Sequence, residues 1–323
     1  MNYSYFYKSN YKNVAELKLL PKYDLFISSY VNSHRVIEPS EHIPTDRKVW
    51  FFSTEDGPDL FLSGKEKIKI SANEDYATFM QALKDFKLIG KRICVDATGF
   101  KIPYLMYLMR CMVAFKIKKF DIIYTEPTLY REAENTRFSD IFNEVKLIEG
   151  MKGLNTSRND NDLLIIAAGY DHSRIADVAN DRKSCKKKVL LFGFPAVSPG
   201  MFQENILRAY KAEEAIATEC FKDMDSNIYA PAYDPFVTAQ AINEYIQRQQ
   251  NSSHKNFTSI YLAPLSTKPH AIGMALYFLW ELGWEKSINL IYPFCQQYIV
   301  DNSDGIARVW RYEIELPTYP NSV

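Results

Sequence analysis

The chain has 323 residues, more than a single hydrophobic core needs, and this length suits two domains of about 150 residues each. Acidic and basic residues number 39 each, so no strong attraction to nucleic acid or to an anionic membrane is expected from the overall charge. The most apolar stretches, 103–115 and 271–284, are shorter than the roughly 20 residues that cross a bilayer, and they predict buried helices. We therefore expect a cytoplasmic protein with no membrane partner.

In the first half of the chain, β-rich runs alternate with helical patterns, an order typical of parallel βαβ units. The runs RICVDAT and FDIIYT have no polar alternate face, as expected for strands that helices cover on both sides. The predicted strands are 24–30, 48–53, 92–97 and 120–125, and the predicted helices are about 74–88 and 102–116.

The segment 150–162 collects Gly, Asn, Ser and Asp without an apolar period, and we predict that it links two domains, 1–153 and 154–323. A β-like run at 308–316 ends the second domain and is expected to pair with a sheet edge. The other strands predicted there are 162–169, 187–194, 259–264 and 288–293, and the predicted helices are 171–180, 200–217, 234–248 and 269–282.

The second half of the chain repeats the first in the same order of blocks. DLFISSYVNSHRV at 24–36 is answered by DLLIIAAGYDHSRI at 162–175, KVWFF at 48–52 by KVLLF at 188–192, and IYTEPTLY at 123–130 by IYPFCQQY at 291–298. The repeat predicts two tandem Rossmann-like α/β units with mainly parallel sheets, related by internal duplication, the second with an inserted helix near 200–217. Such a pseudo-dimer is expected to bind its ligand in the groove between the copies.

Polar residues gather in the turn VDATGFKIP, where a strand leads into a helix. Asp96, Thr98, Gly99 and Lys101 lie there, at the strand end where open α/β sheets bind ligands. A hydroxyl, a lysine and the positive end of a helix together favour a phosphate or carboxylate, and a glycine permits close approach of the backbone.

The equivalent turn of the second half, LAPLSTKPHAIG, supplies Thr267 and Lys268. These residues predict the same anion-binding chemistry in the second copy. The alternative for both turns is that the hydroxyl caps the helix and the lysine is solvated.

A second pair of clusters follows the first strand of each half, with Ser33 and Arg35 in one and Ser173 and Arg174 in the other. Arginine binds phosphate through two parallel hydrogen bonds, and a serine can fix its orientation. The alternative is that each serine caps the next helix and each arginine pairs with a nearby acid.

Three residues are candidates for acid or base catalysis: His34, His172 and Glu126. No nucleophile with an orienting acid can be assigned from spacing, so the catalytic residues are unknown and Glu126 has the alternative of a solvated loop carboxylate. Two tyrosine pairs, Tyr124/Tyr130 and Tyr292/Tyr298, recur at matching positions. Two interpretations are open: the rings stack on a base, or they pack a domain interface.

Motifs for cofactors and metals are absent from the sequence. It contains no GxGxxG and no GxxxxGK[ST], which excludes a standard dinucleotide site and a P-loop. It contains no CxxC, HxxxH or HExxH, and its five cysteines are widely spaced. We therefore expect neither a metal nor a cofactor, and we expect reduced, buried thiols.

The DATGFK turn resembles the DxTGGTK-type turn of CARF domains, the Rossmann-like sensors of CRISPR systems that bind cyclic oligonucleotides across a two-fold interface. SAVED domains are similar to two such units fused in one chain. The resemblance implies a role in prokaryotic antiviral defence. Phe100 stands where the motif has a glycine, and the second copy lacks the acid. The residues that the resemblance places at the ligand are Asp96, Thr98, Gly99 and Lys101, with Lys268 as the pseudo-symmetric partner.

Taken together, these features predict a soluble sensor that holds a small anionic, nucleotide-like ligand between its halves through Lys101, Lys268, Arg35 and Arg174. Two alternatives remain open. One is a non-catalytic interaction protein that binds a partner protein, and the other is an enzyme that acts on a nucleotide or phosphosugar.

Overall fold

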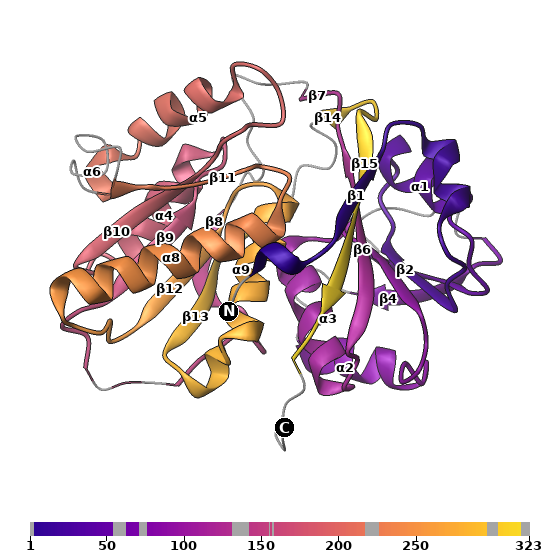
Figure 1. Cartoon of the computed structure of the whole chain (residues 1–323), viewed down its shortest axis with the longest axis horizontal. Helices are drawn as coiled ribbons and strands as arrows, with labels where there is room; N and C mark the ends of the chain where they lie inside the picture. Colours follow the sequence, from indigo (N-terminus) through magenta and orange to yellow (C-terminus); the bar gives the residue numbers. More distant parts are fainter. Residues whose placement is uncertain are drawn as a thin grey trace. The chain divides into compact units, whose positions relative to one another are not determined.

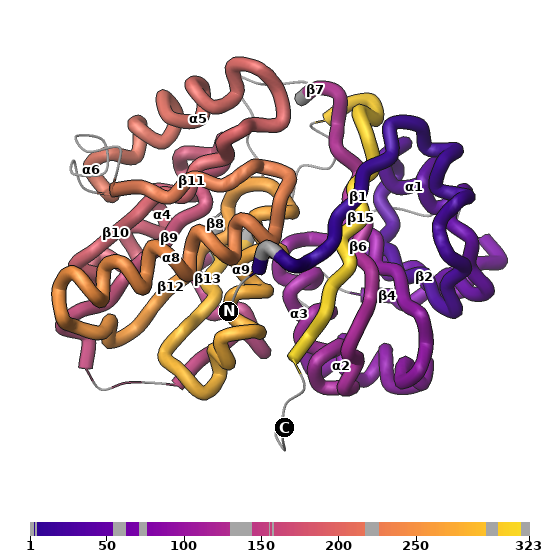
Figure 2. The backbone as a smooth tube through the Cα atoms, viewed as in Figure 1, coloured from indigo at the N-terminus to yellow at the C-terminus, as the bar shows by residue number. Residues whose placement is uncertain are grey.

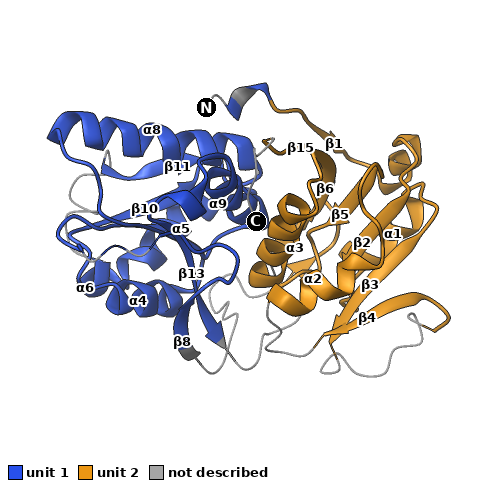
Figure 3. Ribbon diagram, turned by 90° about the horizontal axis from the view of Figure 1, so that it is seen from below, with its two compact units in different colours: residues 1–5, 133–299 blue, residues 6–132, 300–323 orange. Residues whose placement is uncertain are grey.

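The computed structural model describes residues 3–53, 63–70, 76–130, 142–154, 156, 158–216, 226–295 and 303–317. The chain forms two compact units, which Figure 3 shows in different colours. Unit 1 comprises Met1–Tyr5 and Ala133–Ile299, and unit 2 comprises Phe6–Glu132 and Val300–Val323.

Unit 2 contains a seven-stranded sheet. Its strands are β1 (Lys8–Tyr11), β2 (Leu25–Ser29), β3 (Lys48–Ser53), β4 (Glu66–Ile70), β5 (Ile93–Asp96), β6 (Lys119–Glu126) and β15 (Arg308–Glu315), and its helices are α1 (His34–His42), α2 (Tyr76–Lys84) and α3 (Ile102–Ala114). The order in the sheet is β1-β15-β6-β5-β2-β3-β4 (Figure 3), and Figure 1 shows β1, β15 and β6 at one edge. The five strands from β6 to β4 are parallel, whereas β15 is antiparallel to both β6 and β1. Figure 2 shows β1, near the start of the chain, beside β15, near its end.

Unit 1 contains a six-stranded sheet of the order β11-β10-β9-β12-β13-β8. Its strands are β8 (Phe142–Leu147), β9 (Leu163–Ala167), β10 (Lys187–Gly193), β11 (Ile228–Ala230), β12 (Ile260–Pro264) and β13 (Ile288–Cys295), and its helices are α4 (His172–Asp181), α5 (Met201–Tyr210), α6 (Glu213–Ile216), α8 (Pro235–Ser253) and α9 (Lys268–Trp280). Strands β9 to β13 are parallel and β8 is antiparallel. The insertion expected near 200–217 is helix α5 followed by the short α6.

The two sheets agree in strand order and in register. Lys48 lies opposite Phe26 in unit 2, and the matching Lys188 lies opposite Leu164 in unit 1. The pairs β2–β5 and β9–β12 also share one register, as do β5–β6 and β12–β13. The expected α/β fold with two Rossmann-like, mainly parallel sheets is confirmed, and its origin by duplication stays a prediction.

The antiparallel strands β15 and β8 are exchanged between the two sheets: each pairs with a strand of the parallel series from the other half of the sequence. Strand β8 follows β6 in sequence but pairs with β13 in unit 1, and β15 follows β13 in sequence but pairs with β6 in unit 2. The segments that leave and re-enter unit 2 pair with each other through β7 (Leu129–Tyr130) and β14 (Ser303–Asp304). Each five-stranded parallel series therefore takes its antiparallel strand from the other half of the sequence.

The units divide at 5/6, 132/133 and 299/300, in place of the single boundary expected at 153/154. The exchange of β8 and β15 accounts for the last two divisions. The expected linker, 150–162, lies within unit 1. Its Gly153 N–H donates to Asn289 Oδ1 at 3.0 Å, and its Leu154 N–H donates to the carbonyl of Lys286 at 2.8 Å. These bonds fix the segment beside the start of β13.

Helices α3 and α9 are buried along almost their whole length, as the apolar stretches at 103–115 and 271–284 predict. The described thiols, Cys94, Cys111 and Cys185, are buried and free. None of the helices in the described part of the chain is long and apolar enough to span a membrane.

The exchanged strand gives a direct test. Tyr312 in β15 is fully buried and lies opposite Ile122 in β6. Tyr312→Ala removes a large buried aromatic side chain, at a cost of about 3–5 kcal/mol. We expect hydrogen exchange, followed by mass spectrometry, to show lost protection in β6 and β5, while β13, which precedes β15 along the chain, stays protected.

The control is Glu315→Ala, an exposed position in the same strand, which should leave protection unchanged. Lost protection in β13 with β6 unaffected would contradict the exchange.

Candidate functional site

Each unit has one point where the strand order reverses. In unit 2 the chain runs from β2 out to β3 and β4 and then returns to β5 on the other side of β2; in unit 1 the reversal lies between β9 and β12. Open α/β sheets bind ligands beyond the carboxyl ends of the strands at this point. All ten predicted site residues lie there, in the last strand residue, the loop or the first helical turn: Ser33, Arg35, Asp96, Thr98, Gly99, Lys101, Ser173, Arg174, Thr267 and Lys268.

The turn after β5 is held by hydrogen bonds to two neighbouring strands. Asp96 is fully buried; its Oδ2 accepts from Ser28 Oγ at 3.0 Å and its Oδ1 accepts from the N–H of Thr98 at 2.9 Å. Thr98 Oγ1 in turn accepts from the N–H of Thr125 at 3.0 Å. Asp96 and Thr98 therefore shape the turn and join it to β2 and β6.

The two loops at each reversal point are in backbone contact. A Cβ on Gly99 would lie 2.0 Å from the carbonyl oxygen of Ser29, so only glycine fits there. In unit 1 a Cβ on Gly169 would lie 2.0 Å from the carbonyl oxygen of Leu265. The glycine belongs to the β5 loop in unit 2 and to the β9 loop in unit 1. A ligand must therefore lie over the paired loops, because no space is left between them.

Arg35 holds the end of β6. Its Nε donates to the carbonyl of Thr125 at 3.1 Å, and its Nη1 donates to Ser303 Oγ in β14. Its guanidinium carbon lies 5.9 Å from the centre of the Tyr124 ring. The side chain thus joins α1 to the end of β6 and to the returning segment of the chain.

Arg174 makes the equivalent contacts in unit 1. Its Nη2 donates to the carbonyl of Pro293 at 3.0 Å, and its guanidinium carbon lies 4.7 Å from the centre of the Tyr292 ring. The sequence leaves a ligand phosphate or a nearby acid as the alternatives for these arginines, and the structure shows bonds to backbone carbonyls at the ends of β6 and β13 and, for Arg35, to Ser303 Oγ. Both arginines thus brace a strand end, with a tyrosine ring beside each guanidinium group.

Lys101 and Lys268 lie at the starts of equivalent helices. Lys101 is the N-cap residue of α3, is half-buried, and has its Nζ 5.9 Å from the centre of the Tyr104 ring. Lys268 is the first residue of α9 and is also half-buried. Each lysine therefore lies at the positive end of a helix dipole. The ammonium charge and the dipole both favour an anion there.

The hydroxyl groups of Thr267, Ser33 and Ser173 differ in whether they cap a helix. Thr267 caps α9: its Oγ1 accepts from the N–H of His270 at 3.4 Å and donates to the carbonyl of Ala232 at 2.6 Å. Ser33 is the N-cap residue of α1 but makes no capping bond with its side chain. Ser173 is exposed in the first turn of α4.

Glu126 is a structural acid. Its side chain is buried, with Oε2 accepting from Trp310 Nε1 at 2.6 Å and Oε1 lying 3.4 Å from Arg308 Nε. A solvated loop carboxylate is therefore excluded, and these contacts fasten β15 to the end of β6.

His34 is exposed at the start of α1 and lines a hollow of about 530 Å³ in unit 2. Lys12, Glu38 and Asp304 contribute to the same lining. None of the ten predicted binding residues lines this hollow. His172, the other histidine considered as a base, is the first residue of α4.

Helix α5 packs over the reversal point of unit 1. The sequence predicts a helix in this region but not its contacts with the reversal point. Asn205 Nδ2 donates to the carbonyl of Ala168 at 2.7 Å, and the guanidinium carbon of Arg208 lies 5.0 Å from the centre of the Tyr170 ring. Among the described residues of the first half, which leave out 54–62 and 71–75, no helix matches α5. The insertion therefore makes the two candidate sites unequal.

His270 is a buried residue that sequence reasoning missed. Its ring is fully buried in α9, with Nε2 3.3 Å from the carbonyl oxygen of Ala230. Burial lowers the pKa of His270 to about 4, so the ring is neutral at physiological pH. It joins α9 to the end of β11 close to the Thr267 cap.

Within the described residues, no group of three or more His, Cys, Asp or Glu side chains is arranged to hold a metal ion.

The sequence matches no protein-family model, and no curated protein is similar to it. Among solved structures, the CobK precorrin-6A reductase is similar with a TM-score of 0.21 and 11% sequence identity, over 83% of this chain and 87% of that chain. So weak a likeness supports no statement about activity or ligand. The α/β fold described above rests on the strand order and register of the chain itself.

His270 makes the stability of unit 1 dependent on pH. Because its pKa is lowered from 6.5 to about 4 by folding, the unfolded chain takes up a proton below pH 6.5 that the folded chain takes up only near pH 4. Stability should therefore fall as the pH drops through this interval, by at most about 3 kcal/mol. Urea unfolding of unit 1 at pH 7 and at pH 4.5 measures the loss.

His270→Gln keeps a donor for Ala230 and has no titrating ring, so it should reduce this loss, whereas His254→Gln at an exposed position should not. An equal loss in wild type and His270→Gln would show that the ring does not carry the effect.

Proposed function

We propose that this protein is a ligand-binding sensor for a small anionic, nucleotide-like molecule, bound over the carboxyl edges of its sheets. The observation that supports it best is the equivalent placement of Lys101 and Lys268, each at the start of a buried helix beside a reversal point. A lysine at a helix start suits a phosphate, because the ammonium charge and the helix dipole add.

The surrounding groups favour binding over catalysis. The acids at the ends of β5 and β6, Asp96 and Glu126, are buried and bonded to the protein. The equivalent arginines, Arg35 and Arg174, brace the ends of β6 and β13 beside the proposed sites. A rigid edge of this kind orients binding groups and leaves their bonding unchanged on ligand entry.

The resemblance of the turn after β5 to that of CARF domains makes cyclic oligonucleotides the first ligands to test, followed by mono- and dinucleotides. Lys101→Ala/Lys268→Ala should abolish stabilisation by such a ligand, because a ligand raises the melting temperature only by binding the folded state. Thermal unfolding with and without each nucleotide measures the effect. For a ligand at 100 times its Kd the wild-type chain should gain about 2.7 kcal/mol.

The matched control is Lys84→Ala/Lys255→Ala, which removes two exposed lysines outside the proposed sites. It should keep the ligand response, and both variants should melt close to wild type without ligand. A wild-type melting temperature that no nucleotide in the panel changes would overturn the proposal.

A further inference from the structure

The amino-terminal edge of the unit 2 sheet carries a positively charged hollow. None of the candidate functional residues described above lines it. Its volume is about 510 Å³, within the range of small-molecule sites. It lies at the starts of β2, β5 and β6, three neighbouring strands. The lining residues are Lys22, Asp24, Gly90, Lys91, Arg92 and Lys119.

Two of the four cations are bonded to neutral groups. Lys91 Nζ donates to the carbonyl of Phe86 at 2.7 Å, and Arg92 Nη1 donates to the carbonyl of Lys22 at 3.2 Å. The one carboxylate of the lining, Asp24, accepts from the backbone N–H of Arg92 at 2.7 Å. Carbonyl partners orient these side chains but leave their charge uncompensated.

The other two cations, Lys22 and Lys119, form ion pairs with Asp46 and Glu315, which do not line the hollow. All four side chains are at least half exposed. Exposed pairs of this kind contribute about 0–1 kcal/mol, so a multivalent anion can compete for both lysines.

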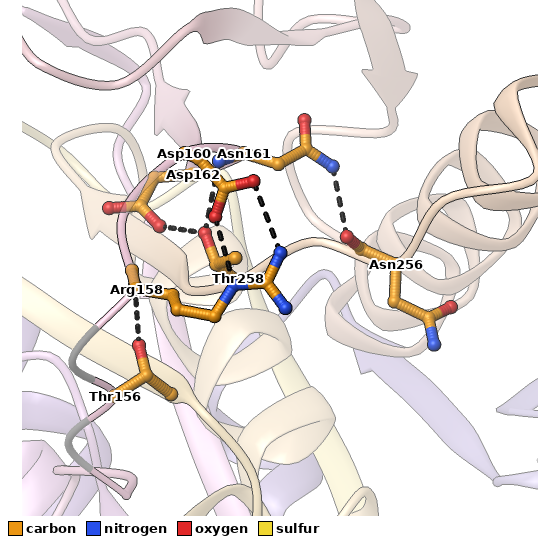
Figure 4. A network of polar contacts seen from close by, with 7 residues as sticks. All are labelled: Thr156, Arg158, Asp160, Asn161, Asp162, Asn256 and Thr258. Carbon is orange, nitrogen blue, oxygen red and sulfur yellow. Dashed lines mark hydrogen bonds and ion pairs between the residues drawn. The ribbon is translucent and has the colours of Figure 1, made fainter.

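At the equivalent edge of unit 1, polar side chains are bonded to one another (Figure 4). Asp162, which matches Asp24, accepts from Thr258 Oγ1, and Arg158 pairs with Asp160 at 3.2 Å. There Arg158 pairs with its neighbour Asp160, and Ser287 holds the position that matches Lys119. The fold therefore does not require a cation at that position of the edge.

We propose that the hollow binds a small anion that carries two or more phosphate groups, at the opposite edge of the sheet from the sensor site. Three flexible ammonium groups and one guanidinium fork surround a single bonded carboxylate, a composition suited to several phosphate oxygens. A free oligophosphate and the phosphate tail of a nucleotide share this chemistry. The site is independent of the nucleotide site proposed above.

Calorimetric titration of the full chain with inorganic tripolyphosphate at low ionic strength tests the proposal. Lys91→Glu/Lys119→Glu should weaken binding by at least about tenfold, because two attractive charges become repulsive. Lys18→Glu/Lys84→Glu, which changes the net charge equally at exposed positions outside the lining, should bind within about twofold of wild type at the same salt concentration. Lys91→Gln/Lys119→Gln, a milder change, should give an intermediate affinity and serves if the reversal variant unfolds.

A titration with ATP separates the two sources of phosphate: affinity equal to that of tripolyphosphate indicates that the phosphates alone are bound, and tighter ATP binding lost in Lys91→Glu/Lys119→Glu indicates a nucleotide. Two outcomes would overturn the proposal. One is no binding of tripolyphosphate by wild type, and the other is binding that Lys101→Ala/Lys268→Ala abolishes and Lys91→Glu/Lys119→Glu does not. The latter would assign the phosphates to the sensor site.

Discussion

The pairing of β15 with β6 is the interaction on which the arrangement of unit 2 depends. It joins eight residue pairs between segments from different halves of the chain and covers one edge of a parallel sheet. An uncovered β6 would present a row of unpaired backbone donors and acceptors. Val309, Tyr312 and Ile314 of β15 are buried, so the strand also completes the core of the unit.

The exchange has a consequence for the candidate sites. The ends of β6 and β13, where the chain leaves each parallel series, are the points that Arg35 and Arg174 brace. In unit 2 the same point is fastened to the returning segment by Ser303 and by the Glu126–Trp310 bond. The carboxyl edge of the unit 2 sheet is therefore bonded to the segment by which the chain returns from unit 1.

Much of this architecture can be predicted from the sequence. Buried parallel strands appear as continuous apolar runs, and the repeat shows that these runs recur in the same order along both halves of the chain. The rule that ligands bind at strand ends placed all ten candidate residues at the reversal points. Strands β1, β4, β8 and β11 were not predicted. EKIKI in β4 is largely exposed and charged, and IYA in β11 is only three residues long. The exchange of β8 and β15 was not predicted either, because both carry alternating patterns that fit the edge of either sheet.

The roles of the arginines could not be predicted for a different reason. At the ends of β6 and β13 they bond to backbone carbonyl oxygens, which every residue supplies and no sequence pattern marks. The buried state of Glu126 likewise depends on Trp310, which the exchange brings from the far end of the chain. The cationic hollow also depends on the folded sheet, since its residues lie at the starts of three strands that become neighbours only there.

Cross-linking of engineered cysteines tests the exchanged topology most directly. Lys119 lies opposite Glu315 in the β6–β15 pair, and Ser287 holds the position before β13 that matches Lys119. The exchange predicts that Lys119→Cys/Glu315→Cys forms a disulfide under mild oxidation and that Ser287→Cys/Glu315→Cys does not. Efficient cross-linking in the second variant and none in the first would show that β15 pairs within its own half of the sequence, which would contradict the exchange.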